Sequence, residues 1–161
     1  MSAARLVLAL ASVAACAAFG RLAVSEDRKK LSTTEAFSAS LLEAERRIRI
    51  DRLPLTELAK AIADEAPDSP LPQMLTLICE GRRDAACGLS SMLVPAAQTP
   101  AAELIRGMGR GDVSAETQRL ALAAERIGAA ACKAREQHEK SARLTNALSL
   151  MLGVGAALVI L

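Results

Sequence analysis

Residues 113–161 read VSAETQRLALAAERIGAAACKAREQHEKSARLTNALSLMLGVGAALVIL and contain no proline. Apolar or small residues recur here three or four positions apart, which is the spacing of one buried helix face. They are Val113, Leu120, Ala124, Ile127, Ala131 and Ala134. Charged residues occupy the opposite face, at Arg119, Glu125, Lys133, Glu136, Glu139 and Lys140. The pattern predicts a long helix with one face in a protein core.

The ends of this predicted helix differ in character. Ser114 is a candidate N-cap, and Glu116 falls in the first turn, where a carboxylate suits the positive helix end. Residues 144–161 carry no charge. An unbroken helix would be about 70 Å long at about 1.5 Å per residue. We expect its first half to pack in a soluble domain and its second half to lie in lipid.

A second apolar block, residues 6–24, lies near the other end of the 161-residue chain. Each block approaches the roughly 20 residues that a helix needs to cross a bilayer. The residues between them carry nearly all the charge. The sequence therefore predicts a transmembrane helix in residues 1–24, a helical domain in residues 25–143 and a second transmembrane helix in residues 144–161.

Cations flank the middle segment on both sides. Arg5 is the only cation before the first block, whereas Arg21 lies near the end of that block and several cations follow it or precede the second: Arg28, Lys29, Lys30, Lys133, Arg135, Lys140 and Arg143. The positive-inside rule places the middle segment in the cytoplasm. The net charge of only +2 gives no strong attraction to nucleic acid.

The first block has an alternative interpretation. Val13-Ala14-Ala15-Cys16 resembles the cleavage box of a bacterial lipoprotein, after a short basic N-terminal region. The chain would then be a lipid-anchored extracytoplasmic binding protein. Against this, the apolar run continues past the cysteine through Ala17, Ala18 and Phe19.

Small residues recur four apart in both apolar blocks. They are Ser12, Cys16 and Gly20 in the first, and Thr145, Ser149, Gly153 and Ala157 in the second. Such spacing lets helix backbones approach closely in lipid, so Ser149, Gly153 and Ala157 are candidates for membrane-helix packing. Chance recurrence in alanine-rich helices is the alternative.

The middle segment predicts a small all-α bundle. It would have about six helices if the long C-terminal helix is included. Thr34 is a candidate cap for a helix over residues 35–52, Pro54 begins the next, and further helices cover about 74–81 and 85–93. Thr99 is a candidate cap for a helix starting at Pro100. The expected inward positions are Phe37, Leu41, Ala44, Ile48, Leu55, Leu58, Ala59, Ile62, Ala63, Met74, Leu75, Leu77 and Ile78.

Four arginines, Arg46, Arg47, Arg49 and Arg52, lie around the junction between the first two bundle helices. Glu43 with Arg47, and Glu45 with Arg49, have ion-pair spacing on a helix. A solvated face is one interpretation of this basic edge. The other is a surface for an acidic partner.

The residues of catalysis and metal binding are sparse. The four cysteines form no CxxC and the chain has one histidine, so we expect buried reduced thiols, no metal, no cofactor and no enzymatic nucleophile–base pair. Two phenylalanines without tryptophan or tyrosine provide no stacking platform for nucleic acid. Residues 107–112, GMGRGD, lack the Lys-Ser/Thr of a P-loop and predict a helix–helix turn.

Three stretches resemble the stage III sporulation protein AB family. Residues 18–21 match its Gly-Phe exit from the first helix, and residues 45–63 match its E-x-x-I-x-Y-x-x-x-P-L block, with Ile50 in place of the tyrosine. Residues 109–112 followed by Gln118 match its L-G-x-S-D…Q region, with Gly111 in place of the serine. That family is related to the cytoplasmic domains of type II secretion inner-membrane platform proteins.

The resemblance implies a membrane platform in a channel between mother cell and forespore, located in the mother-cell membrane around the forespore. It implies that the cytoplasmic domain docks a secretion-type ATPase and contacts other membrane components of the channel. Asp112 and the basic edge are then the candidate partner interface. A membrane scaffold unrelated to sporulation is the alternative, and homo-oligomerisation stays open.

Overall fold

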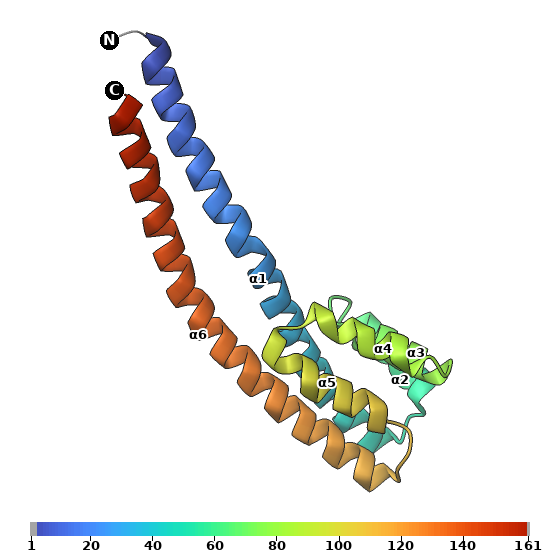
Figure 1. The fold of residues 1–161 in the computed structure, drawn as a ribbon. Coiled ribbons are helices and arrows are strands. Elements are labelled where there is room, and N and C mark those ends of the chain that lie inside the picture. Colours follow the sequence, from blue (N-terminus) through green and yellow to red (C-terminus); the bar gives the residue numbers. More distant parts are fainter. Residues whose placement is uncertain (1–2, 161) are drawn as a thin grey trace. The chain divides into compact units, whose positions relative to one another are not determined.

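The computed structural model describes the backbone of residues 3–160 and the side chains of residues 11, 13–15, 18, 25–145, 147–149, 151–152 and 154–155. Over this part of the chain the regular structure is entirely helical, with six α-helices, one 3-10 helix and no strand (Figure 1). The all-α fold class predicted from the sequence is confirmed.

The chain divides into two compact units. Unit 1 comprises Met1–Lys29 and Arg135–Leu161, and unit 2 comprises Lys30–Ala134. Many side chains of the two predicted membrane segments, including those of residues 1–10, 19–24 and 156–161, lie outside the described part. Among the residues that the structure does describe, no helix is both long and apolar enough to cross a bilayer.

Helix α1 runs from Ala3 to Asp51. Its predicted inward positions Phe37, Leu41, Ala44 and Ile48 are all buried. The predicted helix start at Thr34 is wrong, because α1 continues through this residue. The Thr34 hydroxyl donates to the Lys30 carbonyl of the same helix at 2.7 Å and accepts the N–H of Val94, just before α5, at 3.0 Å.

Helices α2 (Leu55–Glu65) and α3 (Leu71–Cys79) follow, with Pro54 and Pro70 at their N-cap positions. The fixed φ of proline favours both starts. Ser69, in the loop between them, is buried and pairs with Ser40 of α1 at 2.7 Å between the two hydroxyl oxygens. Ala63 of α2, predicted to face inward, is exposed.

Helix α4 (Arg83–Gly88) leads directly into the 3-10 helix η1 (Leu89–Met92), and α5 spans Pro95–Gly107. The predicted start of α5 at Thr99 and Pro100 is wrong. The extended backbone of Val94 suits a residue that precedes proline, and Pro95 takes the first helical position. Pro100 therefore lies inside the helix.

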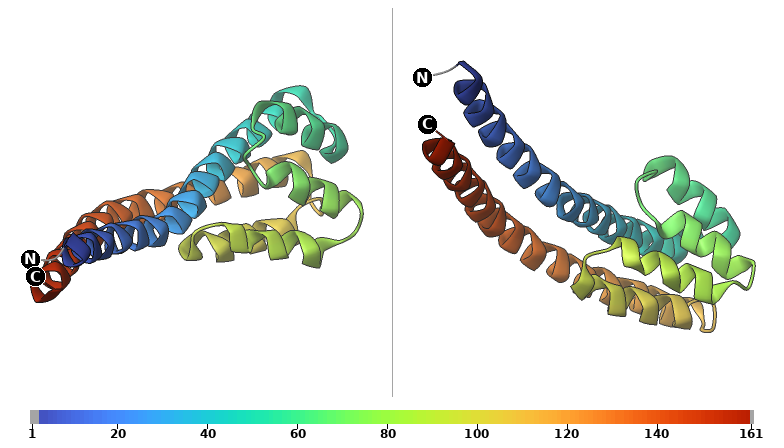
Figure 2. Two further views of the ribbon diagram at one scale, coloured as in Figure 1. Left: turned by 90° about the horizontal axis from the view of Figure 1, so that it is seen from above. Right: turned by 45° about the horizontal axis from the view of Figure 1, so that its top comes forward.

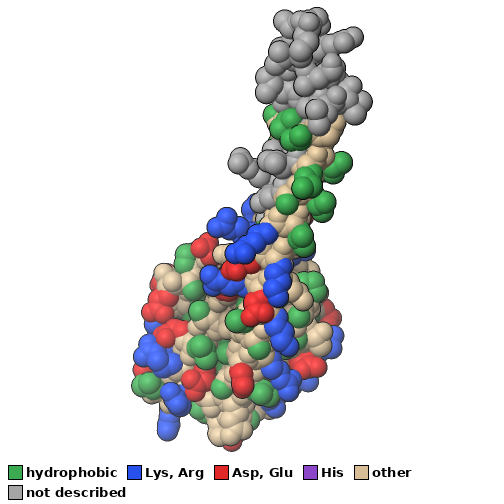
Figure 3. Space-filling view, turned by 90° about the vertical axis from the view of Figure 1, so that its left-hand side faces the viewer, with side chains coloured by type: hydrophobic (Ala, Val, Ile, Leu, Met, Phe, Trp, Pro, Cys, Tyr) green, Lys and Arg blue, Asp and Glu red, His purple; other side chains and the backbone are tan. Residues whose placement is uncertain are grey.

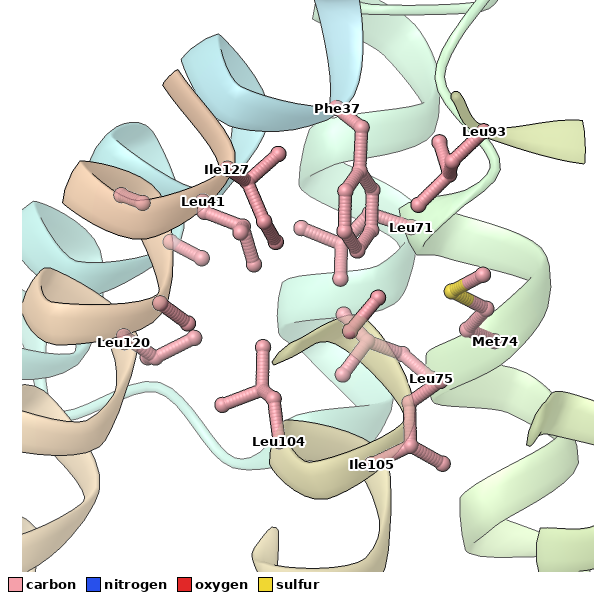
Figure 4. Close-up of a cluster of buried hydrophobic side chains, with 14 of the residues drawn as sticks. Phe37, Leu41, Leu71, Met74, Leu75, Leu93, Leu104, Ile105, Leu120 and Ile127 are labelled. Carbon is pink, nitrogen blue, oxygen red and sulfur yellow. The ribbon is translucent and has the colours of Figure 1, made fainter. Parts of the chain in front are cut away.

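Helix α6 runs from Val113 to Ile160, close to the predicted bounds. The core of unit 2 gathers side chains from α1, α3, α5 and α6, including Phe37, Leu75, Ile105 and Ile127 (Figure 4). Helices α2 to α5 lie together on the parts of α1 and α6 that belong to unit 2 (Figure 2). Val113, predicted to be buried, is 49% exposed at the first position of α6, ahead of Leu120, the first buried hydrophobic residue of that helix.

Candidate interaction surface

The turn between α5 and α6, residues 107–112, is held by a carboxylate from the helix that follows it. Glu116 Oε1 accepts the backbone N–H groups of Gly109, Arg110 and Gly111 at 3.0, 3.2 and 3.1 Å. Gly109 has φ +76°, which is the left-handed region that glycine adopts without strain. The predicted glycine turn is confirmed, and its geometry is fixed by Glu116.

Glu116 is itself buried, with 8% of its surface exposed. Its Oε2 atom has no hydrogen-bond partner among the described residues. The sequence predicted a carboxylate that complements the helix end from its first turn. Glu116 does lie in the first turn of α6, and its side chain also folds back over the preceding turn, where three charge-assisted bonds meet one oxygen.

Two arginines satisfy the carbonyl groups at the end of α5. Arg119 Nη1 donates to Gly107 O at 2.8 Å and lies 3.3 Å from Glu116 Oε1. Arg83 Nη1 donates to Ile105 O at 3.0 Å and Met108 O at 2.8 Å. The last carbonyls of a helix lack partners within it, so these guanidinium groups fix the point where α5 stops.

Asp112 is the N-cap of α6. Its Oδ1 accepts the Ala115 N–H at 2.8 Å, and its carbonyl accepts the Glu116 N–H at 3.0 Å. Ser114, the predicted N-cap, is an exposed residue within the first turn. Asp112 was predicted to lie in a partner interface. One of its carboxylate oxygens caps the N-terminal end of α6.

The turn lies beside the connection between α1 and α2. A Cβ atom placed on Gly109 would be 3.4 Å from Leu55 Cδ1 and 3.6 Å from Arg83 Nη2. The two connections lie at the same end of unit 2 in both Figure 1 and the right-hand view of Figure 2. We call this surface, residues 52–55 and 109–113, the tip. The sequence identified both stretches separately and gave no sign that they are neighbours.

The predicted basic edge is an ion-pair network rather than a row of bare cations. Arg46 binds Glu43 through two nitrogens, at 2.9 and 2.7 Å. Arg47 binds Glu43 at 2.8 Å and also binds Glu65 of α2. The hydrogen bonds from Arg46, followed by those from Arg47, lower the pKa of Glu43 from 4.5 to about 2.

The four arginines of the edge differ in what they offer a partner. Arg47 is only 19% exposed and joins α1 to α2. Arg46 and Arg49 are 53% and 64% exposed, and Arg49 lies 3.4 Å from Glu45. Arg52 is exposed and forms no ion pair with any described residue. The predicted ion pairs Glu43–Arg47 and Glu45–Arg49 are confirmed. Two further ion pairs, Arg46–Glu43 and Arg47–Glu65, were not predicted.

Both signs of charge are interspersed over the face of unit 2 seen in Figure 3. This face gives no broad basic patch of the kind that binds nucleic acid. In the described part of the chain, no group of three His, Cys, Asp or Glu side chains has the arrangement of a metal site. The thiols of Cys79 and Cys132 are exposed, contrary to the predicted burial.

The membrane-packing residues predicted in α6 are described only in part. Ser149 is half-buried, while Gly153, Ala157 and also Cys16 of the lipoprotein interpretation have side chains outside the described residues. Large apolar side chains are exposed along this part of α6, where Figure 3 shows hydrophobic groups following one another. Their exposed fractions are Leu144 64%, Leu148 60%, Met151 73%, Leu152 69% and Val154 47%.

Comparison with family models, curated proteins and solved structures finds no match for this chain.

Proposed function

We propose that this chain is a non-enzymatic membrane platform component that docks a secretion-type ATPase in the cytoplasm. One observation carries the proposal. Helices α1 and α6 each contain one terminal apolar block and also contribute side chains to the core of unit 2. In each helix, no loop separates the apolar block from the core residues. A membrane-attached domain built in this way needs no separate linker.

Apolar exposure on α6 supports the membrane part of the proposal. Leu144, Leu148, Met151 and Leu152 recur at helical spacing and are each at least 60% exposed. Exposed apolar surface of this extent marks a contact with lipid or with another protein. Lys140 and Arg143, immediately before these residues, match the cationic flank expected on the cytoplasmic side of a membrane helix.

The resemblance to the stage III sporulation protein AB family supports the role. It suggests a channel between mother cell and forespore, with this chain in the mother-cell membrane beside other membrane components. The exposed cations of α1 and its end, Arg46, Arg49 and Arg52, then face the ATPase. Exposed ion pairs contribute ~1 kcal/mol or less each, so docking requires several contacts together.

A binding measurement tests the docking role. The full chain, purified in detergent and immobilised, should bind a secretion-type ATPase from the same genome. Binding should weaken between about 0.1 M and 1 M salt, as the Debye length falls from about 10 Å to about 3 Å. Changing Arg46, Arg49 and Arg52 together to glutamate should abolish binding while the helical circular dichroism stays unchanged.

A matched control separates position from net charge. Changing Lys60, Arg82 and Arg126 to glutamate alters the charge equally at other exposed sites of unit 2. We expect this control to bind the ATPase like the wild type. If the two triple variants bind equally well at low salt, the edge of α1 is only a solvated surface. If the wild type binds no such ATPase, the docking role is wrong.

Topology can be tested independently of any partner. A reporter that is active only in the cytoplasm, fused after Arg83, should be active. Activity of an extracytoplasmic reporter at that position would instead favour the lipid-anchored interpretation. Loss of lipid labelling in Cys16→Ser would then identify the anchor.

A further inference from the structure

The turn of the tip is a loop whose backbone is fixed by side chains. Three consecutive N–H groups of the turn bind Glu116, and the carbonyls of Gly107 and Met108 bind Arg119 and Arg83. A surface that is already ordered loses less conformational entropy when a partner binds. The turn has this property despite its three glycines.

Besides the exposed Asp112, the tip presents basic and apolar side chains. Arg52 and Arg110 are exposed and form no ion pair within the described residues. Arg52 precedes Leu55 by three residues, so its Cα lies within about 11 Å of that of Leu55, and Arg110 follows Gly109 directly. Val113 is 49% exposed on the same turn, and Pro54 is exposed on the neighbouring connection.

Acidic groups at the tip offset these cations only in part. Asp112 is exposed and its Oδ1 accepts the Ala115 N–H, so the tip presents one carboxylate beside its two exposed arginines, whereas the Glu116 carboxylate is buried beneath the turn. Arginines around a partly apolar centre are characteristic of protein–protein contact surfaces. Anionic lipid, by contrast, is recognised by clusters of about four to eight cations, which is more than the two unpaired arginines here.

We propose that the tip is a preformed docking surface for an acidic protein surface with an apolar centre, in which Arg52 and Arg110 pair with carboxylates and Val113 packs between them. This inference rests on the proposed function, because it takes the ATPase as the partner. It extends the contact from the edge of α1 onto the turn that Glu116 holds.

Single substitutions test the proposal in the same binding measurement with the full chain in detergent. Arg110→Glu and Val113→Glu should each weaken ATPase binding by about tenfold. Arg126→Glu is the charge control: Arg126 is 57% exposed, 13 residues or about 20 Å further along α6 than Val113. Met92→Glu is the apolar control, because Met92 is 48% exposed in η1. Both controls should bind like the wild type.

A third variant separates the fixed backbone from the side chains. Glu116→Ala leaves Arg52, Arg110 and Val113 unchanged but removes the acceptor of three N–H groups. It should also weaken ATPase binding by about tenfold, with the helical circular dichroism unchanged. Adding Arg110→Glu to it should then weaken binding by less than Arg110→Glu does alone, because a mobile turn no longer places the cation.

The outcomes distinguish the two proposals. If the wild type binds the ATPase and the tip variants bind equally well, the tip is not the docking surface, although the platform role stands. If the controls weaken binding as much as the tip variants, net charge explains the effect and the inference is wrong. If the tip variants reduce binding to vesicles with anionic lipids but not to the ATPase, the tip contacts lipid instead. If no ATPase binds the wild type, the proposed function fails first.

Discussion

Glu116 accepts the backbone N–H of Gly109 at 3.0 Å, seven residues before it in the chain. The same oxygen accepts the next two N–H groups, so one carboxylate defines the path of the backbone from α5 into α6. Its other oxygen is buried without a partner among the described residues. A buried carboxylate oxygen that lacks a partner costs free energy, and the three bonds of its neighbour offset that cost.

Glu116→Ala should therefore destabilise the chain by about 2–4 kcal/mol, because three N–H groups lose their acceptor. Glu116→Gln keeps an acceptor oxygen and should cost roughly half as much. Thermal unfolding followed by circular dichroism gives the size of the effect, and hydrogen exchange gives its location, at the amides of residues 109–111. Glu125→Ala, at an exposed position of α6, is the control and should change neither measurement.

The pH dependence of stability should show the contribution of Glu43. Hydrogen bonds from Arg46 and Arg47 hold the pKa of Glu43 at about 2 in the folded chain, below its ordinary value of 4.5. Because the folded-state pKa is the lower one, the stabilisation is complete above about pH 4.5 and is lost as the pH falls towards 2.

Comparison with Glu43→Gln isolates this contribution. The wild type should melt a few degrees higher at most, since the pair is partly exposed. The difference in melting temperature should be constant between pH 7 and about pH 5 and should shrink below that. A gap between wild type and Glu43→Gln that is the same at every pH would contradict the assignment.

Much of the helical core follows from residue spacing alone. Leu120, Ala124, Ile127 and Ala131 recur on one face of α6 and are buried as predicted. The errors in helix bounds fall at helix starts. Thr34 has the side chain of an N-cap, but a threonine can equally satisfy its hydroxyl on the carbonyl four residues earlier, as it does here on Lys30.

Only part of the candidate site could be predicted, because the bonds that a side chain forms are again not given by its position in the sequence. Three glycines in residues 107–112 indicated a turn, but the role of Glu116 depends on its side chain folding backwards over that turn. A carboxylate four residues after an Asp N-cap, with glycines just before the cap, is the available signal. The proximity of Leu55 to Gly109 is a tertiary contact between residues far apart in sequence, so helical spacing does not encode it.

The buried pair Ser40 and Ser69 leads to a third prediction. Ser40 donates to the Phe37 carbonyl at 2.8 Å, so the proton between the two serines belongs to Ser69. Ser69 Oγ in turn accepts the Leu71 N–H at 3.2 Å, at the start of α3. Each hydroxyl therefore uses its single proton and accepts one further bond.

Ser69→Ala should destabilise the chain by about 1–3 kcal/mol, because it leaves the buried N–H of Leu71 without an acceptor. Ser40→Ala should cost less, because it removes only the acceptor of the Ser69 proton. Thermal unfolding of the two single variants and the double variant checks this order. A larger cost for Ser40→Ala would contradict the role of Ser69 Oγ as the acceptor of the Leu71 N–H.

The last prediction concerns two glycines that share a backbone conformation and differ in surroundings. Gly81, between α3 and α4, has φ +78°, and Gly109 has φ +76°. An added Cβ on Gly81 meets nothing within 4 Å, and one on Gly109 would meet Leu55 Cδ1 at an ordinary contact distance of 3.4 Å. Alanine at either position is therefore strained by its φ and not by crowding.

Gly81→Ala and Gly109→Ala should each lower stability by about 1–2 kcal/mol, the cost of a left-handed conformation for a residue with a Cβ. Gly88→Ala, in the helical backbone of α4 and η1 with open space around it, should be neutral or slightly stabilising. The two strained variants should differ in their amide hydrogen exchange. Only Gly109→Ala distorts a residue whose N–H is bound by Glu116, so only this variant should speed exchange at residues 109–111. Equal protection of these amides in both variants would show that the turn tolerates the strain and that Glu116 is not what sets its path.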